Sequence, residues 1–251
     1  MKVENNNLPE IEKQKFNFDN GIKFISKLLA NNWHQLLLLA IGVYIPLQIF
    51  GIMATKLWQY EAGFPFDVPI LLAVHETVNS QLDVFAVTLA KIGSPKTLIP
   101  VLLVINLVLV FSKRWRLSAY LLAAGFGSAT INHAAKVFFH RVRPHLWEPI
   151  VHEGSFAFPS GHAMASFTFA AILIVLAWHT RWRVLAFIFG AAFVPGVAWT
   201  RLYLAVHFPS DIIAGWLIAL AWVVGVYAII RPYKNQTNLT EEEVKVSEAN
   251  A

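Results

Sequence analysis

The sequence of 251 residues contains no cysteine. This absence excludes disulfide bonds, thiolate metal sites and the chemistry of cysteine-nucleophile phosphatases. It also means that cysteine usage gives no indication of an oxidising or a reducing compartment. Charged residues are scarce as well, at 14% of the chain, whereas a typical soluble domain has about 25%.

Apolar residues are abundant instead. They make up 57% of the chain, and the mean hydropathy is +0.54. This composition predicts an integral membrane protein. The net charge of +5 does not indicate a nucleic-acid partner, because the basic residues fall in short clusters between apolar runs rather than on one polar face.

Long apolar runs predict an all-α, polytopic membrane bundle with six transmembrane helices. Two amphipathic stretches, at about 68–79 and 81–92, look too polar to cross the bilayer. The spans are expected at about 35–55, 96–112, 117–138, 161–179, 184–203 and 209–230.

The six spans form one predicted membrane domain at 34–231, with a polar segment at each end. Residues 1–33 lack the basic start and short apolar run of a cleaved signal peptide, so they are expected to remain as a cytoplasmic arm. Residues 232–251 are predicted to be a disordered cytoplasmic tail. Most Lys and Arg residues fall on the side of the termini, so the positive-inside rule predicts cytoplasmic termini, in what we expect to be a bacterial plasma (inner) membrane.

Three polar clusters lie at span ends that this topology places on the non-cytoplasmic face. In the first, Lys136 and Arg143 are seven residues apart, so they share a helix face if the helix continues that far. Two cations could then bind one anion. Taken alone, the cluster is more typical of basic side chains that snorkel from a span end.

The second cluster is Pro159-Ser160-Gly161-His162, at the start of the fourth span. Pro159 ends any preceding structure, Ser160 is a good N-cap, and Gly161 lets the backbone approach a ligand closely. Free amides of the following helix would then point at an anion. The turn alone could equally be an ordinary helix cap.

The third cluster contains Arg201, His207 and Asp211, before a last span that Pro209 suits in its first turn. Asp211 lies four residues after His207 and can hold the imidazole by one nitrogen, which leaves the other nitrogen as a nucleophile. A His–Asp pair alone is more often structural. Together, however, the three clusters predict an active site at one membrane face.

This set of residues predicts phosphoryl transfer without a metal ion or another cofactor. The three cations, the Ser160 hydroxyl and the amides near Gly161 would stabilise the equatorial phosphoryl oxygens. His207 would attack phosphorus in line, while His162 would donate a proton to the leaving alkoxide and then activate a water molecule. Asp211 would stabilise the imidazolium of His207 as charge develops.

The motifs Lys-x6-Arg-Pro, Pro-Ser-Gly-His and Arg-x5-His-x3-Asp, in this order, resemble those of the type-2 phosphatidic acid phosphatase superfamily. That superfamily includes lipid phosphate phosphatases, bacterial prenyl-diphosphate phosphatases and vanadium haloperoxidases. The resemblance covers about residues 83–225, and Thr200 stands where the family usually has Ser but keeps a hydroxyl. It implies a general acid, His162, a nucleophile pair, His207 with Asp211, and five phosphate-binding residues, namely Lys136, Arg143, Ser160, Gly161 and Arg201.

Two other groups of polar residues require an interpretation. The His and Glu residues of the loop at 140–158 could form a metal site, but their spacing lacks a compact ligand pair. His133, within the third predicted span, is interpreted as an interior histidine with satisfied hydrogen bonds rather than a catalytic one. The candidate ligands in the loop are His140, His145, Glu148, His152 and Glu153.

The predicted function is hydrolysis of a membrane lipid phosphate through a phosphohistidine intermediate, most simply phosphatidic acid to diacylglycerol. The same motifs would serve an undecaprenyl diphosphate or phosphatidylglycerophosphate phosphatase equally well. A haloperoxidase is disfavoured because six membrane spans suit access by lipids. The alternative of another class is a lipid-phosphate binder or transporter without turnover, which would need the cations but no nucleophile.

Overall fold

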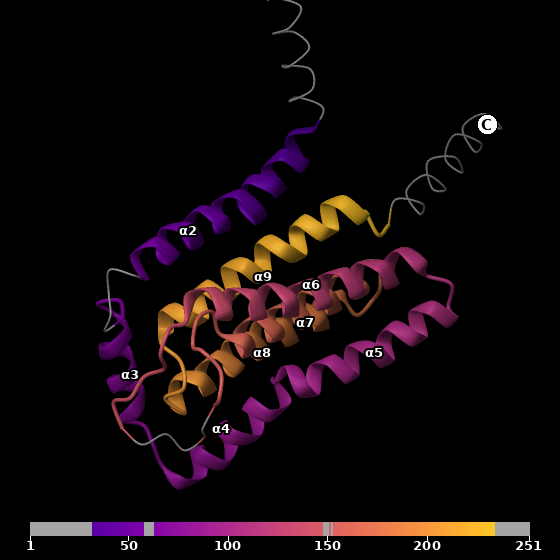
Figure 1. Ribbon diagram of the computed structural model, residues 1–251. Coiled ribbons are helices and arrows are strands. Elements are labelled where there is room, and N and C mark those ends of the chain that lie inside the picture. The colour runs from indigo at the N-terminus through magenta and orange to yellow at the C-terminus, as the bar shows by residue number, and fades with distance from the viewer. Residues whose placement is uncertain (1–31, 58–62, 148–150, 152, 234–251) are drawn as a thin grey trace, which may run out of the picture. The chain divides into compact units, whose positions relative to one another are not determined.

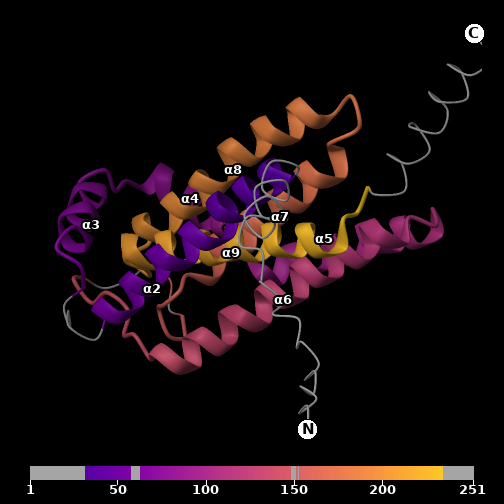
Figure 2. The ribbon, with the colours of Figure 1, turned by 90° about the horizontal axis from the view of Figure 1, so that it is seen from above.

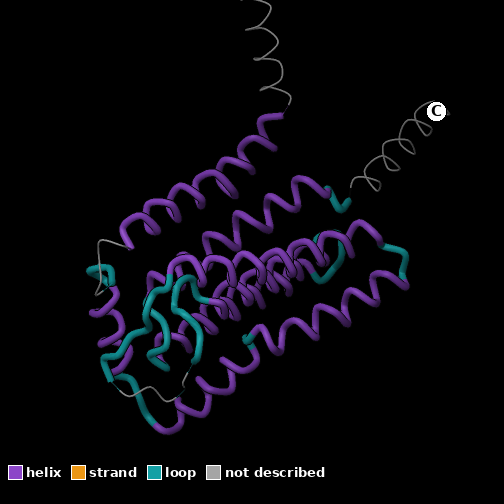
Figure 3. Tube along the Cα trace, in the orientation of Figure 1, coloured by secondary structure: helices purple, strands orange, loops and turns teal. Residues whose placement is uncertain are grey.

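The protein is described from a computed structural model that covers residues 32–57, 63–147, 151 and 153–233. The chain divides after Leu37 into two parts, and the elements named below lie in the second part, apart from the first residues of the helical stretch Asn32–Leu57. Every regular element in these ranges is a helix (Figure 3). The elements are η1 (Ala40–Tyr44), α2 (Ile45–Leu57), α3 (Asp67–His75), α4 (Ser80–Ile92), α5 (Pro95–Phe111), α6 (Trp115–Phe139), α7 (Gly161–Ala177), α8 (Arg183–Tyr203) and α9 (Pro209–Ile230).

The core of the second part is formed by α6, α7, α8 and α9, which run along one another (Figure 1). Helix α7 packs against the other three and contributes Phe169 and Ile172 to the main apolar cluster. Helix α7 carries apolar residues on almost every side. This pattern is expected for a central helix, because a helix surrounded by other helices has no face exposed to solvent. Helix α5 packs against α6 and α7, and α2 packs against α9.

Three helices are long and apolar enough to cross a membrane: the helical stretch Asn32–Leu57, α8 and α9. Helices α4 and α5 together also qualify, although the chain bends by 42° between them. The stretch predicted as a separate amphipathic piece at 81–92 is thus α4, and it leads directly into the second predicted span. These helices support an integral membrane protein, and the total of six spans stays a prediction.

The three sequence clusters come together at one end of the bundle. This end holds the last turn of α6, the first turn of α7, and the turn that joins α8 to α9. Helix α3 packs against α8 and α9 at the same end (Figure 2). The predicted cytoplasmic arm and tail fall almost wholly outside the described residues.

Candidate active site

A cavity of about 600 Å³ lies where these helix ends meet. Its wall contains residues from all three sequence clusters, although up to 71 positions separate them along the chain (207 − 136). Two other predicted site residues, Ser160 and Asp211, are fully buried and lie behind the wall. The predicted residues on the wall are Lys136, Arg143, Gly161, His162, Arg201 and His207.

Lys136 and Arg143 reach the cavity from different kinds of backbone. Helix α6 ends at Phe139, and His140 adopts a left-handed conformation with φ of 49°. The two cations therefore do not share a helix face, and Pro144 explains part of this, since a residue before proline avoids the helical conformation. The Arg143 side chain is held from the loop by the carbonyl oxygens of Ser155, 2.8 Å from Nε, and Val206, 2.5 Å from Nη1.

Ser160 caps α7, as the sequence predicts. Its hydroxyl oxygen accepts a hydrogen bond from the Ala163 amide at 3.5 Å. The hydroxyl is therefore part of the helix cap and does not line the cavity, so its direct contact with phosphate stays a prediction. Gly161 does line the cavity, and a Cβ there would lie 3.1 Å from Oδ1 of Asn132, so a larger residue would crowd the turn.

The first turn of α9 is fixed against the cap of α7 by the main chain. The Ser160 amide donates a hydrogen bond to the carbonyl oxygen of Asp211 at 3.0 Å. Farther along α9, a Cβ on Gly215 would lie 2.9 Å from the Ser160 carbonyl oxygen, so glycine permits this close approach. The second and third clusters are thereby held in register.

The His207 imidazole lies between a carboxylate and a guanidinium group. Nδ1 is 3.4 Å from Oδ2 of Asp211, and Nε2 is 3.2 Å from Nη1 of Arg143. Asp211 is itself held by the Phe208 amide at 2.9 Å. Because an arginine can only donate, Nε2 must carry the lone pair and Nδ1 the proton. This is the tautomer that the proposed nucleophile needs.

Burial lowers the pKa of His207 well below its ordinary value, and the positive charges of Arg143, Arg201 and Lys136 lower this pKa further. The imidazole is therefore neutral at physiological pH. A neutral ring keeps the nucleophilic lone pair that a protonated ring would lack.

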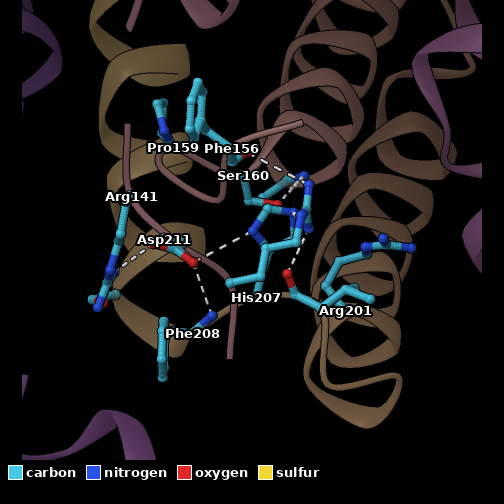
Figure 4. Close-up of polar contacts among 12 residues, drawn as sticks. Arg141, Phe156, Pro159, Ser160, Arg201, His207, Phe208 and Asp211 are labelled. Carbon is cyan, nitrogen blue, oxygen red and sulfur yellow. Dashed lines mark hydrogen bonds and ion pairs between the residues drawn. The ribbon is translucent and has the colours of Figure 1, made fainter. Parts of the chain in front are cut away.

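Arg141 belongs to the site although the sequence analysis did not select it. Figure 4 shows the Asp211 carboxylate between Arg141 and His207. The Arg141 guanidinium donates to Oδ1 of Asp211 at 2.5 Å and to the Ser210 hydroxyl at 2.7 Å. It also lies over the Phe208 ring, 4.4 Å from the centroid. Arg141 lies inside the Lys-x6-Arg motif, of which the sequence analysis selected only the two end residues, Lys136 and Arg143.

Asp67, at the start of α3, completes the network behind His207. Its Oδ2 accepts hydrogen bonds from Arg141 at 2.9 Å and from the Ser210 hydroxyl at 2.6 Å, while Oδ1 accepts from the Ser210 amide at 2.8 Å. The Asp67 side chain is fully buried. The network therefore places one buried arginine between two buried carboxylates, each with further donors, which is the condition for charges to be tolerated in an interior.

Among the described residues, Glu153 is the one acidic side chain on the cavity wall. Its carboxylate forms an ion pair with Arg201 and lies 3.4 Å from Nη2 of Arg143. Burial raises the pKa of Glu153, but the nearby positive charges, Arg201 above all, outweigh this effect and lower the pKa. The sequence offered Glu153 only as a metal ligand. The structure places it against two of the three proposed phosphate-binding cations.

Arg201 retains an unused donor. The residue is 2% exposed, and its Nε has no hydrogen-bond partner among the described residues. A buried donor without a partner costs stability, so it indicates a ligand that is bound at another stage. Lys136 donates to the carbonyl oxygen of Phe156, in the loop that precedes Pro159. The neighbouring Thr200 hydroxyl is used within α8, where it donates to the Val197 carbonyl oxygen at 2.7 Å.

The interpretation of His133 as an interior residue is wrong. Its side chain is exposed and lines the cavity, one helical turn before Lys136 on α6. The cavity therefore extends along α6 from Lys136 back to His133. Lys91 and Lys96, which the sequence analysis did not select, line the same cavity.

No group of three or more His, Asp or Glu side chains in the described ranges is arranged to hold a metal ion. Glu148 and His152, two of the candidate ligands, lie outside those ranges. Positive charge is supplied at the cavity by Lys and Arg side chains instead.

Comparison with known proteins finds a phosphatase family and relatives that are named as lipid phosphatases. The family model of the PAP2 superfamily matches residues 115–234. Phosphatidylglycerophosphatase B of Bacillus subtilis (strain 168) is 31% identical over 139 residues, which cover 53% of this chain and 67% of that protein. Undecaprenyl-diphosphatase of Sulfolobus acidocaldarius is 27% identical over 195 residues, which cover 75% of this chain and 84% of that protein.

The fold is also found in a solved structure. The crystal structure of a transmembrane PAP2 type phosphatidylglycerolphosphate phosphatase from Bacillus subtilis matches with a TM-score of 0.64. The match covers 78% of this chain and 96% of that one, at 23% sequence identity. The arrangement of helices is therefore shared, whereas an identity this low does not extend to the substrate.

Proposed function

Since this chain belongs to the PAP2 superfamily, we propose that it is a metal-independent phosphatase that removes the terminal phosphate of a membrane lipid. The observation that carries the proposal is the cavity itself. Two imidazoles, His162 and His207, share its wall with the three cations Lys136, Arg143 and Arg201. A site that only bound a lipid phosphate would need the cations but not an oriented nucleophile.

The lipid character of the substrate is supported by a second hollow beside the cavity. A groove of about 130 Å³ runs between α5, α6 and α7, and its wall is mainly apolar, with Leu98, Leu102 and Met164 among its residues. Pro95, Asn132 and Gly161 line both the groove and the cavity. A phosphate in the cavity could therefore remain attached to a chain that lies in the groove.

In the first proposed step, His207 Nε2 attacks phosphorus and the bond from phosphorus to the leaving oxygen breaks. Lys136, Arg143 and Arg201 stabilise the equatorial oxygens. His162 takes up a proton when the phosphate anion offsets the surrounding positive charges, and it then gives this proton to the leaving group. Asp211 accepts from Nδ1 and so stabilises the imidazolium that forms. The product is a phosphohistidine at His207.

In the second step, a water molecule attacks the phosphohistidine. His162, now neutral, takes a proton from the water, and the bond from phosphorus to Nε2 breaks to release inorganic phosphate. Both residues return to their starting protonation states. A bound phosphate would compete with the Glu153 carboxylate for Arg201, so Glu153 is expected to separate from Arg201 when substrate binds.

The names of the relatives favour the alternative substrates over phosphatidic acid. One relative is named for phosphatidylglycerophosphate and the other for undecaprenyl diphosphate. We therefore include both substrate types, with phosphatidic acid, in the proposal. The six spans, the cytoplasmic termini, the bacterial inner membrane and the site on the non-cytoplasmic face belong to the same proposal, supported by the apolar helices and the distribution of Lys and Arg.

Phosphate release from purified protein in detergent tests the proposal. The panel contains dioleoyl phosphatidic acid, phosphatidylglycerophosphate and undecaprenyl diphosphate, each with and without EDTA. We expect release from at least one lipid, with no effect of EDTA, and a trapped phosphohistidine after acid-free quenching. Binding of these lipids with no phosphate release from any of them would contradict the enzyme assignment and favour a binder or transporter.

A further inference from the structure

The cavity carries more positive charge than one phosphoryl group requires. Three of its cations are those of the sequence motifs, and Glu153 already offsets part of their charge. Two further cations and His133 line the same cavity, and the described part of the chain adds no second acidic residue to it. Among the described residues, the Lys, Arg and acidic side chains on the wall are Lys91, Lys96, Lys136, Arg143, Arg201 and Glu153.

The two additional lysines are held at a defined bend of the chain. Lys91 lies in the last turn of α4 and Lys96 in the first turn of α5, with a 42° bend between these helices. Ser94 caps α5 by accepting from the Thr97 amide at 3.3 Å. The Thr97 hydroxyl donates to the Lys91 carbonyl oxygen at 2.6 Å and so ties the end of α4 to the start of α5. The backbone that carries both lysines is therefore fixed.

His133 lines the same cavity as the two lysines of this bend and the motif cations. It stands three residues before Lys136 on α6, and residues at this spacing lie on the same helix face. All four side chains, Lys91, Lys96, His133 and Lys136, line one cavity. The second group of donors is thus continuous with the phosphate site and is not a separate surface patch.

We propose that Lys91, Lys96 and His133 bind a second phosphate of the substrate, the one that lies between the reacting phosphate and the lipid chain. The inference rests on the proposed function. In a lipid diphosphate or a glycerophosphate lipid, the order of groups is terminal phosphate, second phosphate, chain. The apolar groove shares Pro95, Asn132 and Gly161 with the cavity, and Pro95 directly precedes Lys96 in the chain, so a lipid chain in the groove would leave the cavity past the start of α5.

The second subsite also has a chemical consequence. In a diphosphate, the oxygen that leaves phosphorus departs with the second phosphate, so negative charge develops on that group as the bond breaks. Cations beside it stabilise this charge in the transition state and raise kcat/KM. A lipid with a single phosphate places nothing at Lys91 and Lys96, so it gains no such stabilisation. The structure therefore favours substrates with two phosphates over phosphatidic acid.

A pair of substrates with the same chain tests the inference. Phosphate release is measured for farnesyl diphosphate and farnesyl monophosphate, with wild type and with Lys91→Gln/Lys96→Gln. We expect kcat/KM to fall about tenfold or more for the diphosphate, by loss of transition-state charge stabilisation. For the monophosphate we expect a fall of less than about threefold, which also shows that the variant is folded.

Two control variants separate a specific subsite from general surface charge. Lys56→Gln/Lys113→Gln removes the same charge at residues that do not line the cavity, and it should leave both activities unchanged. Lys91→Arg/Lys96→Arg keeps the charge and should retain the preference for the diphosphate. His133→Gln should lower the same preference to a smaller extent.

Each other outcome overturns the inference. Equal loss for both substrates, no loss for either, or the same selective loss in the Lys56/Lys113 control would show that the lysines do not bind the second phosphate. In particular, if the lysines only hold anionic headgroups of the surrounding bilayer, both substrates change together when anionic lipid is added to the detergent. Failure of wild type to release phosphate from any lipid would contradict the proposed function itself, and is thereby distinguished from a loss of selectivity alone.

Discussion

The two sides of the His207 ring differ in kind. Behind it, Asp211, Arg141 and Asp67 are buried and joined by hydrogen bonds of 2.5 and 2.9 Å. In front of it, Arg201 has a donor without a partner among the described residues and an ion pair with a partly exposed glutamate. We infer from this difference that the rear side holds the proposed nucleophile in place, whereas the front side binds and releases anions.

The largest effect is expected at His207 itself, because its ring contacts Asp211 on the rear side and Arg143 on the front side. His207→Ala removes the proposed nucleophile, so phosphate release should fall by about 10⁴-fold or more, with no trapped phosphohistidine. His179→Ala is the matched control, since His179 does not line the cavity. Full turnover by the His207 variant would refute the assignment of the nucleophile.

The rear side is tested by Arg141→Gln, which leaves two buried carboxylates without their shared cation. Unfolding should become easier by about 3–5 kcal/mol, because an uncompensated buried charge is costly. Turnover should fall by about 100-fold as the imidazole loses its fixed orientation, with little change in KM. Thermal unfolding in detergent and steady-state kinetics measure the two effects.

A second substitution tells charge from packing in this network. Adding Asp67→Asn to Arg141→Gln removes one of the unpaired charges, so part of the stability should return while turnover stays low. Normal turnover in the Arg141 variant, with or without lost stability, would show that Arg141 has no part in positioning His207 through Asp211.

The front side is tested by Lys136→Ala, which removes a proposed hydrogen-bond donor to phosphate but leaves the proposed nucleophile in place. We expect KM to rise about tenfold and kcat to change by less than about threefold. Lys56→Ala, at a residue away from the cavity, should leave both parameters unchanged. A large fall in kcat without a change in KM would assign Lys136 to the chemical step instead.

A smaller effect is expected from Glu153→Gln, because this change only removes a competitor for Arg201. Inorganic phosphate should inhibit the variant about three- to tenfold more tightly than wild type. The pKa of Glu153 lies below its ordinary value of 4.5, so the carboxylate is charged at neutral pH and stays charged in mild acid. The difference in inhibition should therefore persist at neutral pH and disappear only as the pH falls through that lowered pKa. Equal inhibition at neutral pH would show that Glu153 does not occupy the phosphate position.

The last effect concerns stability in mild acid. The folded state keeps His207 neutral, whereas the unfolded chain takes up a proton near its ordinary pKa of 6.5. The unfolding free energy should therefore decrease by up to about 1.4 kcal/mol per pH unit as the pH falls below 6.5. Thermal unfolding of wild type and His207→Ala between pH 7 and 5 measures this, and an equal slope in both would contradict it.

Local patterns were sufficient to predict much of the helical core. The spans expected at 184–203 and 209–230 are α8 and α9, and those at 96–112 and 117–138 differ from α5 and α6 by only one or two residues at each end. Such helices can be predicted because each apolar run is bounded by a basic or proline-containing turn, and the helix ends where the run ends.

Contacts between distant segments could not be predicted in this way. Asp67 and Arg141 are 74 residues apart, and neither lies in a periodic pattern that would indicate the other. Glu153 stands in an irregular loop, where a charged residue is ordinarily solvated. The end of α6 before Arg143 depends on the left-handed conformation of His140, which the sequence does not indicate for a non-glycine residue.

The amide-to-carbonyl contact between Ser160 and Asp211, with Gly215 beside it, ties together the starts of α7 and α9. His162 stands two residues after Ser160 and His207 four residues before Asp211, so we expect this backbone contact to fix the separation of the two proposed catalytic rings. Substitutions at the α4–α5 bend should therefore leave that separation unchanged, whereas Gly215→Ala should alter it for every substrate at once.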